Sequence, residues 1–247
     1  FVGLSTETGA SSYPTYHAKT DNSTRYIIFD RCLADGGYSR GMQSRIGYGL
    51  NGEHIGVADS YIYDINQPLY ESKAILVISG AGPYTIVNNL LQAGAIGVLF
   101  GGANPGSDAL IPRDITFARN YIYRNPAWVS DSNVAVKNSF EIKHGIRFLV
   151  EHNALENSWD VAQGFMVNIK SVDGYGGVGY ARDVTFRYNT LENFDGGMTF
   201  AAQPSNSNTG LSAPYPLQNV SIHDNRAASG GFDNPVHDGA AIVVEDL

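Results

Sequence analysis

The chain has 247 residues, of which 43% are hydrophobic and 16% are charged, so it holds enough apolar side chains for one large core. Its formal net charge of −8 argues against a nucleic-acid partner, because binding phosphates requires clustered Lys and Arg. No run of about 18 uninterrupted apolar residues occurs, so we expect no membrane span. Cys32 is the single cysteine, which excludes a framework of internal disulfides and a thiolate metal site.

One pattern recurs seven times along the chain, from RYIIFDRCLAD at Arg25, through RDVTFRYNTLEN at Arg182, to QNVSIHDNRAAS at Gln218. Two alternating apolar positions are followed, three places on, by a small polar residue and, two places further, by another apolar residue. The alternation is typical of a β-strand with one buried face. The third position is occupied in turn by Cys32, Ser60, Asn89, Asn120, Asn153, Asn189 and Asn225.

This regular repeat predicts a β-helix. A short strand with one apolar face cannot bury it alone, but copies stacked about 4.8 Å apart bury a continuous column. Equal columns require parallel strands. A second set of strands, starting near residues 74, 97, 136, 165, 198 and 240, predicts at least two sheets. We expect an N-terminal cap or partial coil over 1–24 and one parallel β-helix over 25–247. The helix is expected to be truncated at its C-terminal end, because AAIVVEDL reads as a strand still in progress.

Alternation within the second strand set places a group of polar side chains on its outer face. In VKNSFEIK, Phe140 and Ile142 are expected to point inward. In FMVNIK, the expected inward residues are Phe165, Val167 and Ile169. Stacking of the two strands then puts Lys143 beside Lys170 and Glu141 beside Asn168. The outer residues of the two strands are predicted to be Lys137, Ser139, Glu141, Lys143, Met166, Asn168 and Lys170.

Long loops next to these strands supply aromatic rings and carboxylates, and long loops on a rigid scaffold often carry function. Two interpretations of Trp128 and Trp159 remain open at this stage. Their rings form a stacking platform for sugars, or they pack within the loops. The loop residues considered as candidates for substrate binding are Trp128, Trp159, Asp160, Asp173, Tyr175 and Tyr180.

VTFRYNTLEN and ITFARNYIYRN resemble the right-handed parallel β-helix superfamily of pectate lyases and polygalacturonases, the pectin-lyase-like proteins, in which an inward Asn ladder marks one corner. GPYTIVNN, LFGGANPGSDALIPRDITFARNYIYRN and VKNSFEIKHGIRFLVEHNALENSWDVAQGF are similar to a group of secreted acidobacterial β-helix proteins without a defined reaction. That second likeness spans roughly residues 80–193. The resemblance implies an all-β, single-stranded, right-handed parallel β-helix (a solenoid) of about seven coils, whose ladder comprises Asn89, Asn120, Asn153, Asn189 and Asn225.

The resemblance also implies a chemistry, because polysaccharide lyases of this architecture use Lys or Arg as a base and often Ca²⁺ to neutralise the uronate. The candidate bases or clamps in this chain are Lys143, Lys170, Arg147 and His144, and the candidate carboxylates are Glu141, Asp160 and Asp173. In a second interpretation, Glu141 only pairs with lysines on a solvated face. A hydrolase is disfavoured, because the paired aspartates that such an enzyme requires are not found.

The sequence therefore predicts an extracellular protein of bacterial type, secreted or at the cell surface, that engages polysaccharide. A lyase reaction on uronate-containing glycans would use Lys143, Lys170, Glu141 and Arg147, with Asn168 and the loop residues named above binding substrate. Calcium is the candidate cofactor, and no metal ligands are assigned. The alternative is a non-catalytic surface, adhesin or fibre protein that self-associates through its exposed solenoid ends.

Overall fold

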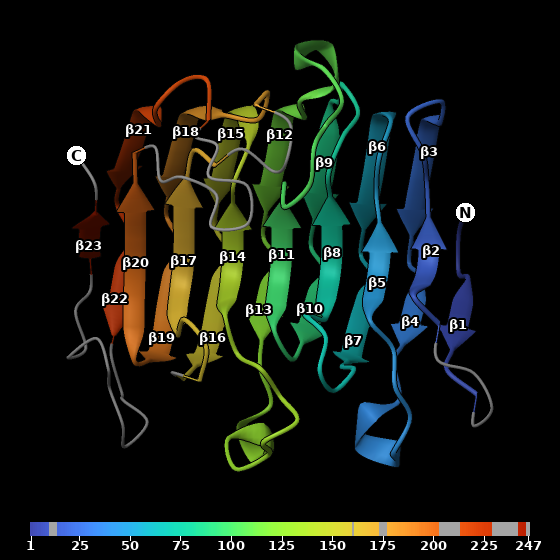
Figure 1. The fold of residues 1–247 in the computed structure, drawn as a ribbon. Coiled ribbons are helices and arrows are strands. Elements are labelled where there is room, and N and C mark those ends of the chain that lie inside the picture. Colours follow the sequence, from blue (N-terminus) through green and yellow to red (C-terminus); the bar gives the residue numbers. More distant parts are fainter. Residues whose placement is uncertain (10–13, 160, 173–176, 203–212, 229–241, 246–247) are drawn as a thin grey trace.

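The structure is a computed structural model and describes residues 1–9, 14–159, 161–172, 177–202, 213–228 and 242–245. Apart from three short 3-10 helices, the regular elements in these ranges are β-strands. They form three sheets, A, B and C, in which every neighbouring pair is parallel. The strands stack side by side from the N-terminal to the C-terminal end of the chain, with sheet C facing the viewer in Figure 1. This arrangement is consistent with a parallel β-helix.

The chain visits the three sheets in rotation. Sheet A contains β3 (Arg25–Asp30), β6 (Glu53–Ala58), β9 (Tyr84–Val87), β12 (Arg113–Ala118), β15 (Gly145–Glu151), β18 (Ala181–Arg187) and β21 (Gln218–His223). Sheet B contains β1 (Ser5–Glu7), β4 (Leu33–Asp35), β7 (Tyr61–Ile65), β10 (Leu90–Ala93), β13 (Tyr121–Tyr123), β16 (Ala154–Ser158), β19 (Thr190–Phe194) and β22 (Arg226–Ala228). Sheet C contains β2 (Tyr16–Lys19), β5 (Ile46–Gly49), β8 (Lys73–Val77), β11 (Ile96–Phe100), β14 (Asn138–Ile142), β17 (Phe165–Lys170), β20 (Gly196–Ala201) and β23 (Ile242–Glu245). The 3-10 helices are η1 (Tyr38–Arg40), η2 (Asp108–Leu110) and η3 (Pro126–Trp128).

The strand register confirms the repeat. In sheet A, Ile115 pairs with both Tyr84 and Phe148, and Phe117 lies two residues along in the same alignment. In sheet B, Ile122 pairs with Leu91 and Leu155, each of which is the apolar residue two places after the Asn of its repeat. Sheet B is also an addition to the prediction, which required only two sheets. Its strands are mostly three to five residues long, too short for alternation to identify them.

The core lies between the three sheets and is continuous along the stack. Its largest fully buried side chains include aromatic rings, and Phe100 meets Phe148 edge-on with ring centroids 5.1 Å apart. Two residues depart from the predicted alternation. Phe165, expected to point inward, is buried but is not part of the main core cluster. Met166, expected on the outer face of sheet C, is fully buried in the main core cluster. Gly97 lies two strands before Met166 in the same part of sheet C, and an added Cβ there would meet Ile122, so this end of the strands turns inward.

The corner between sheets A and B has the same backbone conformation in each coil. A non-glycine residue with φ between 51° and 56° precedes the small polar residue, at Arg31, Asp59, Asn88, Arg119, His152, Tyr188 and Asp224. Left-handed backbone is unfavourable for such side chains, by about 1 kcal/mol or more. The small polar residue that follows makes hydrogen bonds to neighbouring coils, and these offset the cost. Asn120, for example, donates its amide to Asn153 Oδ1 at 3.1 Å and to the Ile86 carbonyl at 2.9 Å.

Residues before the first repeat also belong to the sheets. β1 pairs with β4 in sheet B and β2 pairs with β5 in sheet C, so the segment 1–24 contributes to a coil. No helix in the described ranges has the length and apolar character needed to cross a membrane.

Candidate functional site

The outer face of sheet C changes from apolar to polar along the stack. One register position is occupied by Leu76 and Leu99 in β8 and β11, and then by Glu141, Asn168 and Thr199 in β14, β17 and β20. The leucines belong to an apolar cluster separate from the main core, and the three polar residues are buried. The predicted neighbours Glu141 and Asn168 are therefore paired in register. At this register position, the polar side chains therefore come from β14, β17 and β20.

Glu141 is the centre of the polar region. Its side chain is fully buried, and its Oε1 atom lies 3.5 Å from Nζ of both Lys143 and Lys170. Among the described residues, neither carboxylate oxygen has a hydrogen bond of ordinary geometry. Burial alone would raise the pKa of Glu141, but the positive charges of Lys143 and Lys170 outweigh it and hold the pKa below its usual value. Glu141 is therefore a buried anion that keeps two ammonium groups together.

A second carboxylate brings two further lysines into the group. Glu71 lies 2.6 Å from Nζ of Lys137 and 3.5 Å from Nζ of Lys73. Burial would raise the pKa of Glu71, but the hydrogen bond from Lys137 and the charge of Lys73 lower it to about 2. Burial lowers the pKa of Lys73 to about 8, against the opposing effect of Glu71. We call Lys73, Lys137, Lys143 and Lys170, with Glu71 and Glu141, the lysine cluster.

The lysine cluster is unusual for this chain. The sequence has five lysines, and only Lys19 lies outside the cluster. Four cations against two carboxylates leave an excess of two positive charges in a protein whose net charge is −8. Burial lowers the pKa of Lys170, while Glu141 opposes that effect. The cluster is therefore a partly desolvated, net positive region on an acidic molecule.

Sequence reasoning placed Lys143, Lys170, Glu141 and Asn168 correctly together but missed part of the cluster. Lys73 and Glu71 were not considered, and Lys137 was placed on the outer face without a role. The sequence did contain a signal for the cluster, because lysine is rare in this chain. All five lysines stand in or beside strands of sheet C, and four of them form the cluster.

The two tryptophans do not form an exposed platform. Trp128 and Trp159 are 5% and 3% exposed and pack with Val134, Val136 and Tyr38. Tyr38 meets Trp128 edge-on, with ring centroids 5.5 Å apart. The structure therefore favours the loop-packing interpretation. The error in assigning them to substrate has a simple cause, since a large apolar ring in a loop gains more by burial than by exposure.

Tyr180 is buried as well. It is 6% exposed, its hydroxyl donates to Asp108 at 2.9 Å, and its ring meets Tyr215 edge-on. These contacts join three connecting segments beside sheet C, so Tyr180 positions the loops. Asp160, Asp173 and Tyr175, which were also predicted to bind substrate, lie outside the described residues.

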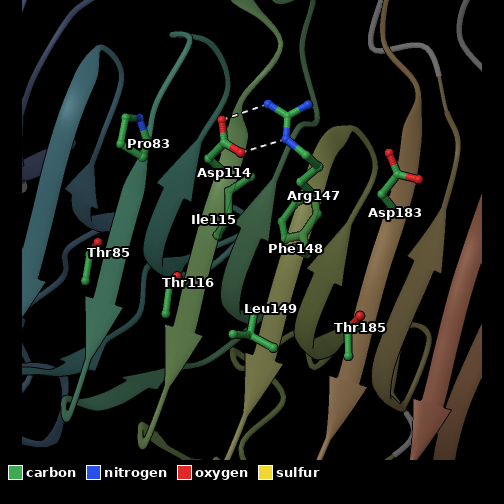
Figure 2. Close-up of a pocket in the computed structure, with 10 residues that line it drawn as sticks. All are labelled: Pro83, Thr85, Asp114, Ile115, Thr116, Arg147, Phe148, Leu149, Asp183 and Thr185. Carbon is green, nitrogen blue, oxygen red and sulfur yellow. Dashed lines mark hydrogen bonds and ion pairs between the residues drawn. The ribbon is translucent and has the colours of Figure 1, made fainter.

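Arg147 lies on a different sheet. It belongs to β15 in sheet A, and its guanidinium forms a bidentate pair with Asp114 at 2.6 and 2.7 Å (Figure 2). The pair borders a shallow, open cavity of about 490 Å³ along which Thr85, Thr116 and Thr185 are spaced. The hydrogen bond from Arg147 lowers the pKa of Asp114. The structure does not bring Arg147 to the lysine cluster.

His144, the other candidate base, is fully buried, with Nε2 2.6 Å from the Ile78 carbonyl oxygen. Its ring therefore bonds to the backbone of a coil two turns earlier. Within the part of the chain that the structure describes, no group of three or more His, Cys, Asp or Glu side chains is arranged to hold a metal ion.

Comparison with known proteins adds no identity. No family model matches the sequence, and no similar curated protein is found.

Proposed function

We propose that this protein binds acidic polysaccharide along the outer face of sheet C and that it is extracellular. The observation that carries the proposal is the lysine cluster, in which four ammonium groups surround two carboxylates. A uronate-containing glycan presents one carboxylate per acidic sugar. Several ammonium groups set along one face suit such a chain better than a single strong site would.

The proposal includes a finer description of the fold. We propose a right-handed parallel β-helix of about seven coils with an Asn ladder, of the pectin-lyase-like kind. Supporting it are the strand register of the repeat and the amide hydrogen bonds that run from Asn89 through Asn120, Asn153 and Asn189 to Asn225. Such a scaffold presents a long straight face, and an extended polymer matches that shape.

The lysine cluster also suits a lyase reaction. A base removes the proton on the carbon next to the uronate carboxylate, the bond from the neighbouring carbon to the glycosidic oxygen breaks, and a carbon–carbon double bond forms while the leaving oxygen takes up a proton. Lys170 suits the base, because burial lowers its pKa. Lys143 suits the clamp that stabilises charge on the carboxylate, and Glu141 orients both side chains.

Calcium has no assigned place in this mechanism, since the described residues provide no cluster of ligands for it. Arg147, on sheet A, is left out of the reaction. Trp128 and Trp159 are assigned to support of the loops beside the site.

The test is a panel of uronate-containing glycans, assayed for binding and for the ultraviolet absorbance of an unsaturated product, with calcium and with chelator. We expect Lys143→Ala and Lys170→Ala each to weaken binding about tenfold, the loss of one charge-assisted contact. Lys19→Ala is the matched control, because Lys19 is exposed on β2 in the same sheet and lies outside the cluster. Equal binding by all three variants would contradict the proposal.

The same assay separates the enzyme from the non-catalytic alternative. Product absorbance that disappears in Lys170→Ala supports the lyase. Binding that depends on Lys143 and Lys170, without any new absorbance, supports a surface or adhesin protein instead. Self-association through the solenoid ends is tested by sedimentation of the same samples.

A further inference from the structure

A second cavity, of about 420 Å³, lies at the corner between sheets A and B, and the lysine cluster contributes no residue to it. Its walls come from three successive coils. Three of its residues belong to sheet B and three to the left-handed corner positions just before it, namely Tyr61, Leu90, Tyr121, Asp59, Asn88 and Arg119. We call this cavity the corner pocket.

The sheet B side of the corner pocket has an apolar floor between two aromatic rings. Leu90 pairs in register with Tyr61 on one side and with Tyr121 on the other. Tyr61 is 55% exposed, and the Tyr121 hydroxyl donates to Glu156 on the following strand, which holds the ring in place. Two strand spacings separate the tyrosines by about 9.6 Å. A saturated six-membered ring in van der Waals contact on both faces needs about 7–8 Å, so one sugar ring fits between them.

The corner side of the pocket supplies an unpaired cation. Each of the other ten arginines in the sequence has a carboxylate, carbonyl or aromatic partner. The Arg119 guanidinium is exposed, and among the described residues it has no such partner. Arg31 occupies the equivalent left-handed position three coils earlier, and there Asp30 binds it at 2.8 Å. A guanidinium left without a carboxylate at the mouth of a pocket is a ready site for one.

The remaining polar groups limit the charge of the ligand. Asp59 accepts a hydrogen bond from the Asn88 amide, and its carboxylate stands in the same corner row as Arg119. A polyanion would be repelled by Asp59. A ligand with one carboxylate and several hydroxyl groups would place its anion on Arg119 and donate hydroxyl hydrogens to Asp59.

We propose that the corner pocket binds a single carboxylated sugar ring, a uronic acid residue, stacked over Leu90 between Tyr61 and Tyr121 with its carboxylate on Arg119. This site is separate from the lysine cluster and does not depend on the function proposed for that cluster. It lies at the corner between sheets A and B, whereas the lysine cluster lies on sheet C.

The test is titration of the ¹⁵N-labelled protein with sodium glucuronate, followed by two-dimensional NMR, with glucose as the neutral probe. We expect glucuronate to shift the backbone amide signals of Tyr61, Leu90, Arg119 and Tyr121. Glucose should shift them at least tenfold less at equal concentration, since it lacks the charge-assisted contact. Signals from residues 138–143 report the lysine cluster separately.

Two matched variants decide the role of the guanidinium. Arg119→Gln should weaken glucuronate binding at the corner pocket about tenfold, whereas Arg31→Gln, the same change at the equivalent corner position, should leave it unchanged. The NMR spectra themselves show that both variants are folded. Corner signals that stay still with glucuronate, that shift equally with glucose, or that shift equally in Arg119→Gln would overturn the proposal.

Discussion

Sheets A and C use charge in opposite ways on their outer faces. On sheet A, exposed charges pair across neighbouring strands, as Arg25 does with Glu53 and Arg147 with Asp114. On sheet C, four lysines share two carboxylates, and Glu141 is fully buried. Exposed pairs contribute little because water screens them, whereas buried charges depend strongly on their partners. The same scaffold therefore carries paired charges on the outer face of sheet A and an excess of positive charge on the outer face of sheet C.

The largest effect is expected from Glu141→Gln. The change removes the buried anion between Lys143 and Lys170 and leaves two partly buried ammonium groups without their partner. We expect the free energy of unfolding to fall by about 3 kcal/mol, measured by urea denaturation at pH 7. A loss no greater than that of an exposed pair would show that the lysine cluster is solvated after all.

Removing one amide from the corner should come next. In Asn153→Ala, the Asn120 amide and backbone N–H lose their acceptor, and the Phe117 carbonyl loses a donor. We expect a loss of about 2–3 kcal/mol. Asn219→Ala is the control, since within the described part of the chain that exposed amide has Asp183 as its single partner. Equal losses in the two variants would contradict the claim that the buried corner amides stabilise the fold more than an exposed amide does.

A pH titration sharpens the comparison at Lys73. Its pKa in the folded protein, about 8, lies below the ordinary value of 10.5 because of burial. Folding therefore disfavours the ammonium form, and the penalty is complete below pH 8 and disappears as the pH rises to 10.5. We expect the Lys73 contribution to stability to increase between pH 8 and 10.5, by on the order of 1–3 kcal/mol. Nζ-detected NMR should follow the titration directly, and a midpoint near 10.5 would contradict burial of this amine.

The smallest effect is expected on sheet A. Asp114→Asn breaks the exposed pair with Arg147, and the free energy of unfolding should change by less than about 1 kcal/mol. The same urea experiment used for Glu141→Gln measures it. A loss as large as that of Glu141→Gln would mean that the two faces do not differ in the way described.

The sequence predicted the repeat well, because period-two alternation follows from strand geometry and the recurrent Asn stands at the corner that follows the sheet A strand of its repeat. Ile115, Phe117 and Ile122, the apolar residues of one repeat, pair in register with Phe148, Val150 and Leu155 of the next. The prediction of at least two sheets left the third one open, since its strands are short. The inward turn at Met166 was missed because alternation fails where a strand bends. Such local bending is invisible to a pattern count.

The candidate site was predicted in part. Strand register alone brought Glu141 to Asn168, since both follow from one alignment. Arg147 was misplaced relative to the lysines because sequence proximity to Lys143 hides a turn between sheets C and A. Lys73 was missed because its contact with Glu71 and the effect of burial on its pKa depend on three-dimensional packing.

The repeated left-handed corner has a consequence for changing the length of the molecule. Arg119 and His152 close successive coils with the same backbone geometry, and the residue after each is an Asn whose amide bonds to the coil beyond. A second copy of residues 120–152 inserted after His152 would therefore meet matching geometry at both joints. We expect that the protein can be extended by whole turns, and each added turn would carry a further copy of Glu141 and Lys143.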